Sequence, residues 1–431
     1  MKIGELASRC QVTKDTIRYY VEKGLLIPFK KGAQMDFSER EKNDLLYIQR
    51  MKQMHFTVRE MQEVLTLRRL SNLIEPDTIA AYERILKQKK TEIVTEISEL
   101  KQAYRMVEQE LREFRVGREN GGQPLGVPLR ALELLCCPHC KKQLRVSGAQ
   151  ITGRYIESGE LSCDCGYRAK ISDGIVDTGN RYTGQYDSPD LTRGLYRDVG
   201  EEFVTGIQRC SDLVMDRLTE EVLDGRVVME TNINGYFFLY NHIRELEPRC
   251  LYIITDRYPE MLAMYKRLIE TLGLELDLLF IADDSEFFPL QEGCVDLLLD
   301  FYGSNEQVLY KQNSFIQTYG KYLKEDALVL GALFGFERNS QSIKKVSSRY
   351  PECSSIALDA GAMIAACEKA GFLTSEQLVA VCHKTYDKYS FACHQEGEKL
   401  LQYYYEAKQP ENGERSEWSQ KRGVHSNFLQ K

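Results

Sequence analysis

The cysteines in the middle of this 431-residue sequence are its clearest candidates for binding a metal. Cys137 and Cys140 form a CxxC pair in "LLCCPHC", and Cys163 and Cys165 form a CxC pair in "LSCDC". Four thiolates from two short turns suit tetrahedral zinc in a closed, structural site that has no open coordination position. A redox role for the CxxC pair is the alternative, but the second pair favours zinc.

Two residues beside these pairs are not expected to be ligands. Cys136 is interpreted as a small buried side chain, and His139, inside the first pair, as a surface side chain. Because we expect a cytosolic protein, the tight pairing favours a metal site over disulfides. Residues 131–180 are therefore predicted to be a zinc ribbon.

Acidic residues follow three short apolar runs in the C-terminal half of the chain. Glu230 ends "RVVME", Asp256 ends "LYIITD", and Asp283 follows "LLFIA". Such runs suit buried parallel strands, and ligands of parallel sheets bind beyond the carboxyl ends of the strands. Because an acid at the end of the second strand commonly binds ribose hydroxyls, the sequence predicts a site for a nucleoside-like ligand.

The turn that follows Glu230 differs from a typical cofactor-binding turn. Such turns carry several glycines, whereas this one has Asn232, Asn234 and the single Gly235. Glycine lets the backbone approach a ligand and adopt a positive φ, and asparagine tolerates a positive φ but adds a side chain. No His or Cys of this half is convincingly placed as a nucleophile or base. We therefore expect the turn to bind a ligand rather than to support efficient catalysis.

An α/β domain, residues 181–407, must position these side chains. Apolar runs suited to strands are Val227–Glu230, Leu251–Asp256, Leu278–Ala282, Val295–Asp300 and Ala327–Leu333. Helical stretches separate them at 236–246, 259–272, 305–323 and 357–370. This alternation predicts a doubly wound, Rossmann-like sheet. The polar residues 408–431 are expected to be a disordered tail.

Tyrosines are frequent in the same half of the chain. They include Tyr302, Tyr310, Tyr319 and the cluster at 403–405. Each one alone is usually a core or rim residue, but together they could line an aromatic pocket.

Residues 1–75 predict a winged helix-turn-helix. "IGELASRCQVTKDTIRYYVEKGLLIP" indicates two short helices joined by a tight turn, and Thr13 is a good N-cap for the second helix. "PFKKGAQMDFSE" indicates a two-stranded wing. Side chains that point outward here can bind phosphates or base edges. The residues that we expect to contact DNA are Thr13, Lys14, Thr16, Arg18, Tyr19, Lys30 and Lys31. For the two wing lysines the alternative is a solvated hairpin tip.

A long helix is predicted over residues 76–116, which contain no proline after Pro76. Apolar residues recur there every seven positions: Ile79, Leu86, Ile93, Leu100, Val107 and Phe114, with Ile97, Tyr104 and Leu111 as the second seam. A sustained heptad favours a dimeric coiled coil over a helix packed on its own chain. The turn-rich residues 117–130 are predicted to be a linker.

The charge distribution separates the first part from the rest. Residues 1–70 contain 14 Lys and Arg against 9 Asp and Glu, a net charge of +5, which leaves −12 on the remainder. A basic module on an acidic body suggests that only the first part binds a polyanion. No apolar run approaches membrane length and the N-terminus lacks an apolar stretch, so we expect a cytoplasmic protein without membrane contact.

The pattern "IGELA…V…TIRYYVEKGLL", a wing, and "FSE…DLLYIQRMKQMHFTVREMQEVL" resembles the MerR family of transcription regulators over residues 1–70. The resemblance implies DNA contacts at Lys14, Thr16, Arg18 and Tyr19 and at wing residues near Lys30 and Lys31. It also implies an antiparallel homodimer that acts with RNA polymerase at promoter DNA. The chain departs from the family in the wing, where Gln34 and Met35 replace the usual Tyr-Arg pair.

Two further resemblances cover the remainder. "CPHC…CDCGYRAKISDGIV", within residues 132–178, is similar to the zinc ribbon ahead of some rRNA guanine methyltransferases. "LLFIADDSEFFPLQEGCVDLLLDFYG" and "MIAACEKAGF" resemble class I methyltransferases over residues 225–375. That family binds S-adenosylmethionine. The resemblance implies that Glu230 and the 232–235 turn face its methionine end, Asp256 its ribose and Asp283 its adenine.

The sequence as a whole predicts a dimeric, DNA-binding regulator whose degenerate methyltransferase-like domain senses a small-molecule effector. The alternative is a zinc-ribbon methyltransferase that uses S-adenosylmethionine to modify RNA or a small molecule. A third reading is an interaction platform without a ligand. Because function must be argued from the site and the cofactor turn has lost its glycines, the regulator is favoured and an enzyme is not.

Overall fold

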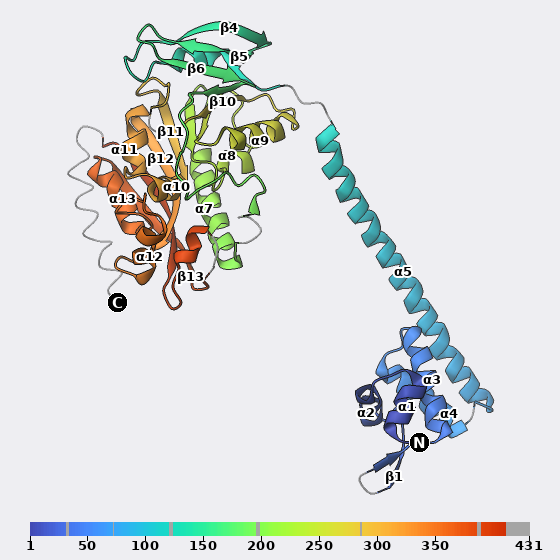
Figure 1. The fold of residues 1–431 in the computed structure, drawn as a ribbon. Helices are drawn as coiled ribbons and strands as arrows, with labels where there is room; N and C mark the ends of the chain where they lie inside the picture. Colours follow the sequence, from blue (N-terminus) through green and yellow to red (C-terminus); the bar gives the residue numbers. More distant parts are fainter. Residues whose placement is uncertain are drawn as a thin grey trace. The chain divides into compact units, whose positions relative to one another are not determined.

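The computed structural model describes residues 1–31, 34–71, 73–119, 124–194, 199–284, 287–385 and 389–410. The chain divides into two compact units, Met1–Val116 and Gly117–Lys431, and each is described separately (Figure 1). Residues 411–431, most of the predicted tail, lie outside the described residues. No helix in the described part of the chain is both long and apolar enough to cross a membrane.

The first unit begins with a helix-turn-helix and a two-stranded wing, as the sequence predicts. Its elements are α1 (Ile3–Cys10), α2 (Lys14–Glu22), β1 (Phe29–Lys31), β2 (Gln34–Asp36), α3 (Glu39–Gln53) and α4 (Val58–Ser71). The two strands pair antiparallel. Leu6, Ile17, Leu45 and Val64 are fully buried and form the centre of a small apolar core.

Side-chain caps fix where these helices begin. The Thr13 hydroxyl accepts a hydrogen bond from the Thr16 amide at 3.1 Å, which confirms the predicted N-cap of α2. Ser38 forms a capping box at the start of α3, and the Thr57 hydroxyl accepts from the Glu60 amide at 3.3 Å. Each cap satisfies an amide that the helix itself leaves unpaired.

A single helix, α5 (Pro76–Glu119), covers the region predicted to be one long helix. Its first turns pack on the helix-turn-helix through Tyr82 and Ile85. Farther along, several apolar side chains are 46–63% exposed, namely Val94, Ile97, Leu100, Tyr104 and Val107. The side chains of residues 111–119 are not described. The roles of Leu111 and Phe114 in the seven-residue repeat therefore stay predictions.

The second unit is built on one mixed sheet. Its described strands pair in the order β13-β14-β12-β11-β8-β9-β10-β7-β6-β5-β3, with β4 on β5. The central strands are β8 (Val227–Thr231), β9 (Leu251–Asp256), β10 (Asp277–Ala282), β11 (Val295–Phe301) and β12 (Leu323–Phe336), and they pair parallel. They match the predicted strands, except that β12 is longer at both ends. The antiparallel strands β13 (Leu373–Cys382) and β14 (Leu400–Lys408) were not predicted.

The strands around the cysteine pairs belong to the same sheet. They are β3 (Val127–Pro128), β4 (Arg145–Thr152), β5 (Tyr155–Ser162), β6 (Arg168–Ser172) and β7 (Ile175–Asp177). A short 3-10 helix, η1 (Leu129–Leu134), follows β3. β7 pairs parallel with β10, with Val176 opposite Ile281, and both side chains are fully buried. The predicted ribbon region and the predicted α/β domain are thus joined through one sheet.

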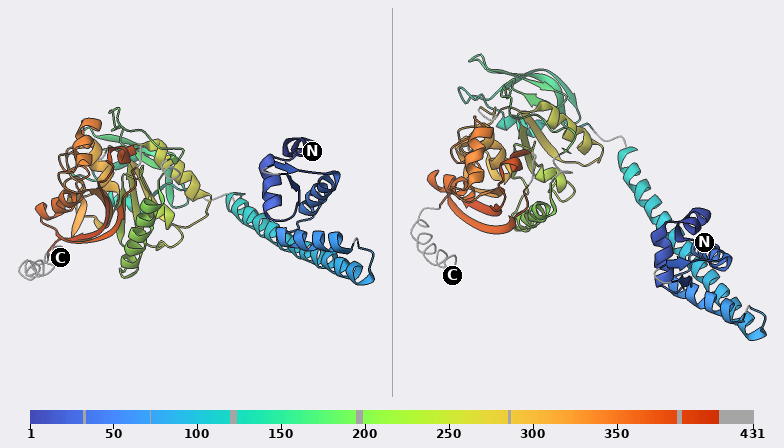
Figure 2. Two further views of the ribbon diagram at one scale, coloured as in Figure 1. Left: turned by 90° about the horizontal axis from the view of Figure 1, so that it is seen from below. Right: turned by 60° about the horizontal axis from the view of Figure 1, so that its bottom comes forward.

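Helices cover both faces of the central strands. α7 (Glu201–Thr219) and α9 (Pro259–Glu270) lie on one side, and α11 (Phe315–Tyr319) and α13 (Ala360–Lys369) lie on the other (Figures 1 and 2). The remaining described helices are α8 (Phe238–Asn241), α10 (Gly303–Tyr310), α12 (Gln341–Arg349) and the 3-10 turns η2 (Gly320–Tyr322) and η3 (Tyr389–Cys393). This is the predicted doubly wound α/β architecture, with α7 and α12 as helices that the sequence did not indicate.

Two predicted helices differ from the observed ones. The stretch 236–246 is an α-helix only at α8, and Phe237, Phe238 and Leu239 are buried in succession, whereas a regular surface helix would expose part of such a run. The stretch 305–323 is broken into α10, α11 and η2. α10 ends at Tyr310, and Ser314 starts α11 with its own capping box.

Candidate functional site

The two cysteine pairs come together as the spacing predicts. The Sγ atoms of Cys137, Cys140, Cys163 and Cys165 all lie within 4.8 Å of one another. The Cys137–Cys165 and Cys140–Cys163 Sγ distances are both 3.3 Å. Sulfurs around a tetrahedral zinc with bonds of about 2.3 Å are about 3.8 Å apart, so the cluster fits one metal ion with small adjustments.

Tight turns bring the thiols of each pair to the same side. In the first turn the Cys137 amide donates to the Lys142 carbonyl at 2.7 Å. In the second, the Cys163 amide donates to the Tyr167 carbonyl at 3.0 Å, and Gly166 adopts a φ of +95° that a side chain would strain. Cys136 is buried and His139 is exposed, and neither belongs to the cluster. The donor set is compatible with a metal and offers no open position for catalysis.

The three acids at the strand ends lie at the same edge of the sheet, where each is hydrogen-bonded within the chain. Glu230 is 1% exposed and accepts from the amides of Phe238 at 2.7 Å and Leu239 at 2.8 Å, which fixes the start of α8. Burial raises the pKa of Glu230 to about 8, and the two amide donors oppose this shift.

Asp256 holds the turn that follows Glu230. One oxygen accepts from the Asn234 amide at 2.9 Å and the other from the Tyr258 amide at 2.8 Å, and the residue is 1% exposed. Burial raises the pKa of Asp256 to about 6, while Arg257 and the two amides favour its charged form. Both oxygens of the acid that the resemblance assigns to ribose therefore bind the chain's own backbone.

Asp283 is bonded to residues that follow β7. The Thr178 hydroxyl donates to its Oδ2 at 2.6 Å, and the Asn180 amide group donates to its Oδ1 at 3.3 Å. Asp283 is also buried. The assignment of Glu230, Asp256 and Asp283 to a nucleoside stays a prediction, and all three already have partners in this structure.

The asparagines of the turn have distinct local roles. Asn232 adopts a φ of +57°, a left-handed conformation that asparagine tolerates better than most residues with a side chain. Its side chain donates to the Gly303 carbonyl at 3.3 Å. Asn234 accepts from the Asp190 amide at 3.0 Å and donates to the Ser188 carbonyl at 3.3 Å. The turn keeps the backbone shape that glycine would allow, but its side chains bind other parts of the chain.

The residues bound by Asn234 and Asp283 form one stretch, 178–194, which we call the crossing segment. Besides the contacts above, Arg193 donates to the carbonyls of Asn234 at 2.7 Å and Gly235 at 3.0 Å. The crossing segment therefore spans from the end of β10 to the turn after β8. It lies against the edge of the sheet where the resemblance implies a cofactor.

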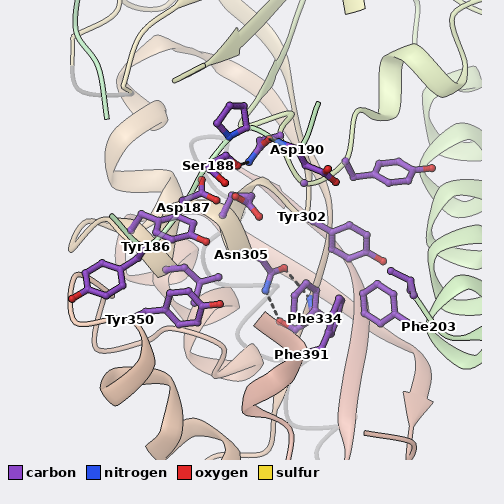
Figure 3. A pocket seen from close by; sticks show the side chains of 18 of the residues that line it. Tyr186, Asp187, Ser188, Asp190, Phe203, Tyr302, Asn305, Phe334, Tyr350 and Phe391 are labelled. Carbon is purple, nitrogen blue, oxygen red and sulfur yellow. Dashed lines mark hydrogen bonds between the residues drawn. The ribbon is translucent and has the colours of Figure 1, made fainter. Parts of the chain in front are cut away.

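A cavity of about 650 Å³ lies beside the turn. It is lined by part of the crossing segment, by α7, by the turn residues Asn234 and Gly235, and by α10. Figure 3 shows Asp187, Ser188 and Asp190 of the crossing segment grouped near the rings of Tyr186 and Tyr302. Glu230, Asp256 and Asp283 are not among the described residues that line it. The open space is therefore displaced from the ribose and adenine positions that the resemblance implies.

Aromatic rings form one wall of this cavity. Phe203, Phe334 and Phe391 pack together with ring centroids 4.7–5.3 Å apart (Figure 3). Tyr302 extends the cluster, with its ring 5.7 Å from that of Phe334 and its hydroxyl bonded to Gln402 at 2.8 Å. A wall of fixed rings suits an apolar or aromatic ligand.

A buried arginine supports the opposite part of the cavity. Arg257 is 4% exposed and its guanidinium pairs with Asp187 at 2.9 Å and Glu306 at 3.0 Å. The same group lies 4.4 Å from the ring centroid of Tyr310. Burial, followed by the negative charge of Asp187, raises the pKa of Glu306 above its usual value, and Arg257 opposes the shift. Asp187, Glu306 and Tyr310 all line the cavity.

Sequence reasoning found only part of this pocket. Tyr302 and Tyr310 line it, as the tyrosine content suggested, whereas Tyr319 and the 403–405 cluster do not. Asp187, Arg257 and Glu306 were missed because they are far apart in sequence. The dense polar and aromatic run "RYTGQYDSPD" was the signal that could have indicated a structured segment there.

The predicted DNA-contacting residues lie on and beside α2. Lys14, Arg18 and Tyr19 are exposed, and Arg18 forms a 2.7 Å ion pair with Asp15. The side chains of Thr13 and Thr16 are 2.8 Å apart and bonded to each other. The side chains of Lys30, Lys31 and Gln34 lie outside the described residues.

Comparison with known proteins agrees with the helix-turn-helix. Residues 1–67 match the family described as MerR HTH family regulatory protein, so this part is a MerR-type domain. The chain is similar to the transcription regulator PbrR691 from Ralstonia metallidurans CH34 in complex with lead(II). That match has 24% identity and a TM-score of 0.24, and covers 28% of this chain and 89% of that chain. Curated proteins give no match.

Solved methyltransferases are similar to the second part of the chain. One is an S-adenosylmethionine-dependent methyltransferase from Aquifex aeolicus, with 13% identity, TM-score 0.33, and coverage of 50% of this chain and 98% of that chain. Another is a geranyl diphosphate C-methyltransferase from Streptomyces coelicolor A3(2), with 10% identity, TM-score 0.35, and coverage of 46% and 76%. The parallel order of the central strands gives this unit a methyltransferase-like α/β fold.

Replacing a cysteine of the cluster should release the metal. We expect Cys140→Ser to abolish stoichiometric zinc, because a closed structural site needs all four thiolates. Cys353→Ser is the matched control, since Cys353 is a free cysteine outside the cluster. The protein with this substitution should keep its zinc. Metal content per chain is measured by atomic emission. Equal zinc in wild type and Cys140→Ser would contradict the four-cysteine site.

Removing the Asn234 side chain should loosen the crossing segment. Asn234→Gly loses two hydrogen bonds, and at about 1 kcal/mol for each bond the amide of Asp190 should exchange at least fivefold faster with deuterium. Asn339→Gly is the control because it makes the same substitution at an exposed residue outside the crossing segment.

A double variant tests whether the turn limits cofactor binding. We expect calorimetry to give little heat when wild type is titrated with S-adenosylmethionine or its demethylated product. The heat should increase in Asn232→Gly/Asn234→Gly, because without the two asparagine side chains the ligand can approach the backbone of the turn. Unchanged affinity in this variant would show that the turn was not the obstacle.

Proposed function

We propose that this protein is a dimeric, DNA-binding transcription regulator whose methyltransferase-like unit senses a small-molecule effector. The observation that carries the proposal is the cavity of about 650 Å³, lined by rings and carboxylates, in a chain that begins with a MerR-type domain. A cavity of this size suits a drug-sized ligand. A ligand that prefers one state of the unit would shift the equilibrium of the whole protein.

Promoter DNA is the proposed partner of the first unit. The exposed Lys14 and Arg18 on α2 offer cations for phosphates or a guanine edge, and the Tyr19 hydroxyl can bind a phosphate. The net charge of +5 over residues 1–70 supports contact with a polyanion. Action together with RNA polymerase follows from the resemblance to the MerR family.

A homodimer is proposed through α5. Leu100 and Val107 of the predicted seven-residue repeat are exposed, as are Ile97 and Tyr104, which we assign to the second seam. Exposed seams of this kind are buried when two helices pair. Two recognition helices in a dimer can then bind a site with twofold symmetry.

The alternative proposal is an S-adenosylmethionine-dependent enzyme. Its support is the methyltransferase-like fold and the cavity next to Asn234 and Gly235. Against it stand the acids of the implied cofactor site, because Glu230, Asp256 and Asp283 already bind groups of the chain. We therefore favour sensing over methyl transfer, with the structural metal, proposed as zinc, held apart from the effector.

Charge in the seam of α5 should dissociate the dimer. We expect Leu100→Glu to give monomers in sedimentation equilibrium at micromolar concentration, because two carboxylates would be buried across the seam. Gln102→Glu is the control. It adds the same charge on the same helix, outside the predicted seam, and should leave the dimer intact. A dimer that persists in Leu100→Glu would contradict pairing through this helix.

The proposed regulator should bind a specific duplex through α2. Selection from a random duplex library should yield a site with twofold symmetry, and Arg18→Ala should bind it about 10- to 100-fold more weakly, the cost of losing a good base contact. Arg40→Ala, an exposed arginine at the start of α3, is the control with little expected effect. Failure to select any site with intact, zinc-loaded protein would count against the regulator.

A further inference from the structure

We propose that the cavity beside the turn binds a bulky organic cation, whose charge is received by Asp187 and Glu306 and whose apolar body is enclosed by the aromatic rings. This inference rests on the proposed sensing function and names the ligand class of the same site. It follows from four observations: the charges on the cavity wall, two carboxylate oxygens that accept no hydrogen bond from the described residues, a neighbouring arginine that is held by carboxylates and rings, and the cavity size.

The charged residues that line the cavity favour a positive ligand. Asp187, Asp190 and Glu306 line it, and the base among the described lining residues is Arg349, which is exposed to solvent. Arg257 lies behind the wall and is not part of the lining. It pairs with both Asp187 and Glu306, and Arg193, also outside the described lining, adds a second positive charge near Glu306. A lining with three acids and one exposed base favours a cation over an anion.

Two carboxylate oxygens on this wall have no hydrogen-bond donor among the described residues. The Oδ2 of Asp187 binds Arg257 and Tyr258, and the Oε2 of Glu306 binds Arg257. The structure records no hydrogen bond from its described residues to Asp187 Oδ1 or Glu306 Oε1. A carboxylate that is largely removed from water gains from each donor it receives. Burial and the nearby Asp187 raise the pKa of Glu306, whereas Arg257 and Arg193 favour its charged form, and a bound cation would do the same.

Arg257 illustrates how this wall holds a cation. Its guanidinium is surrounded by Asp187, Glu306 and the ring of Tyr310 at 4.4 Å, with Tyr182 at 5.2 Å. Carboxylates supply charge and ring faces supply attraction that does not depend on hydrogen bonds. Asp187, Glu306 and Tyr310 also face the cavity, so a ligand there meets the same combination.

The size and shape of the wall define the rest of the ligand. A volume of about 650 Å³ is larger than a metal ion or a simple ammonium needs and fits a body of several fused rings. Phe203, Phe334 and Phe391 provide a continuous apolar surface for it. The ligand class is therefore an amine or other organic cation that carries a polycyclic body.

Three pyrene probes of similar size test the charge preference. Full-length, zinc-loaded protein is titrated with 1-pyrenemethylammonium, neutral 1-pyrenemethanol and 1-pyrenecarboxylate, and binding is followed by pyrene fluorescence. We expect the ammonium to bind about tenfold more tightly than the alcohol, as for one charge-assisted hydrogen bond, and the carboxylate to bind most weakly. Equal binding of all three, or preference for the carboxylate, would overturn the proposal.

Substitutions on the cavity wall locate the probe. Glu306→Gln should weaken ammonium binding about tenfold and leave the alcohol unchanged, whereas the exposed Glu337→Gln is the control with no effect. Because Glu306 also pairs with Arg257, a second pair avoids the buried network. Gln208 is an exposed residue of the lining on α7. Gln208→Glu should tighten and Gln208→Lys should weaken ammonium binding a few-fold, with the reverse order for the carboxylate. No change in any of these variants would also overturn the proposal.

DNA binding separates this inference from the proposed function. The selected duplex is titrated with and without saturating 1-pyrenemethylammonium. If the ammonium binds as described but DNA binding and footprint are unchanged, the ligand class stands and effector sensing fails. If another compound alters DNA binding while the ammonium does not bind, sensing stands and the ligand class proposed here fails.

Discussion

Carboxylates buried at the ends of parallel strands require hydrogen bonds or neutralising charge, and the arrangement of the second unit follows from meeting this requirement. β8, β9 and β10 bring Glu230, Asp256 and Asp283 to one edge of the sheet. The start of α8 satisfies the first acid, the turn at Asn234 the second, and the crossing segment the third. As a result these acids shape the chain locally, and the open cavity is displaced toward α7 and α10.

Features set by local sequence were predictable, and features set by distant contacts were not. The cysteine pairs, the N-cap at Thr13 and the central strands each depend on a few adjacent residues, and all are present in the structure. The positive φ of Asn232 also follows from a residue type. The pairing of Arg257 with residues 187 and 306 depends on how the crossing segment folds over the sheet, and the sequence of that segment has no periodicity to indicate it. The antiparallel β14 was missed because its tyrosines suggested a pocket rather than a strand.

The asparagines that stand where cofactor-binding turns usually carry glycine have structural roles of their own. Asn232 preserves the backbone shape, and Asn234 ties the turn to the crossing segment. A glycine at either position would keep the turn but lose a link between separate parts of the unit. The side chains at these two positions therefore connect parts of the unit that are separate in the sequence.

The pairing of β7 with β10 determines whether the edge of β10 is exposed. Without β3 to β7, β10 would be an outer strand whose apolar residues and unpaired amides could add a strand from another molecule. Strands β3 to β7 precede β10 in the chain, so during synthesis they emerge before the strand that they shield. The small module that holds the four thiols thereby covers one edge of the parallel strands, and it is synthesised before the strand that it covers.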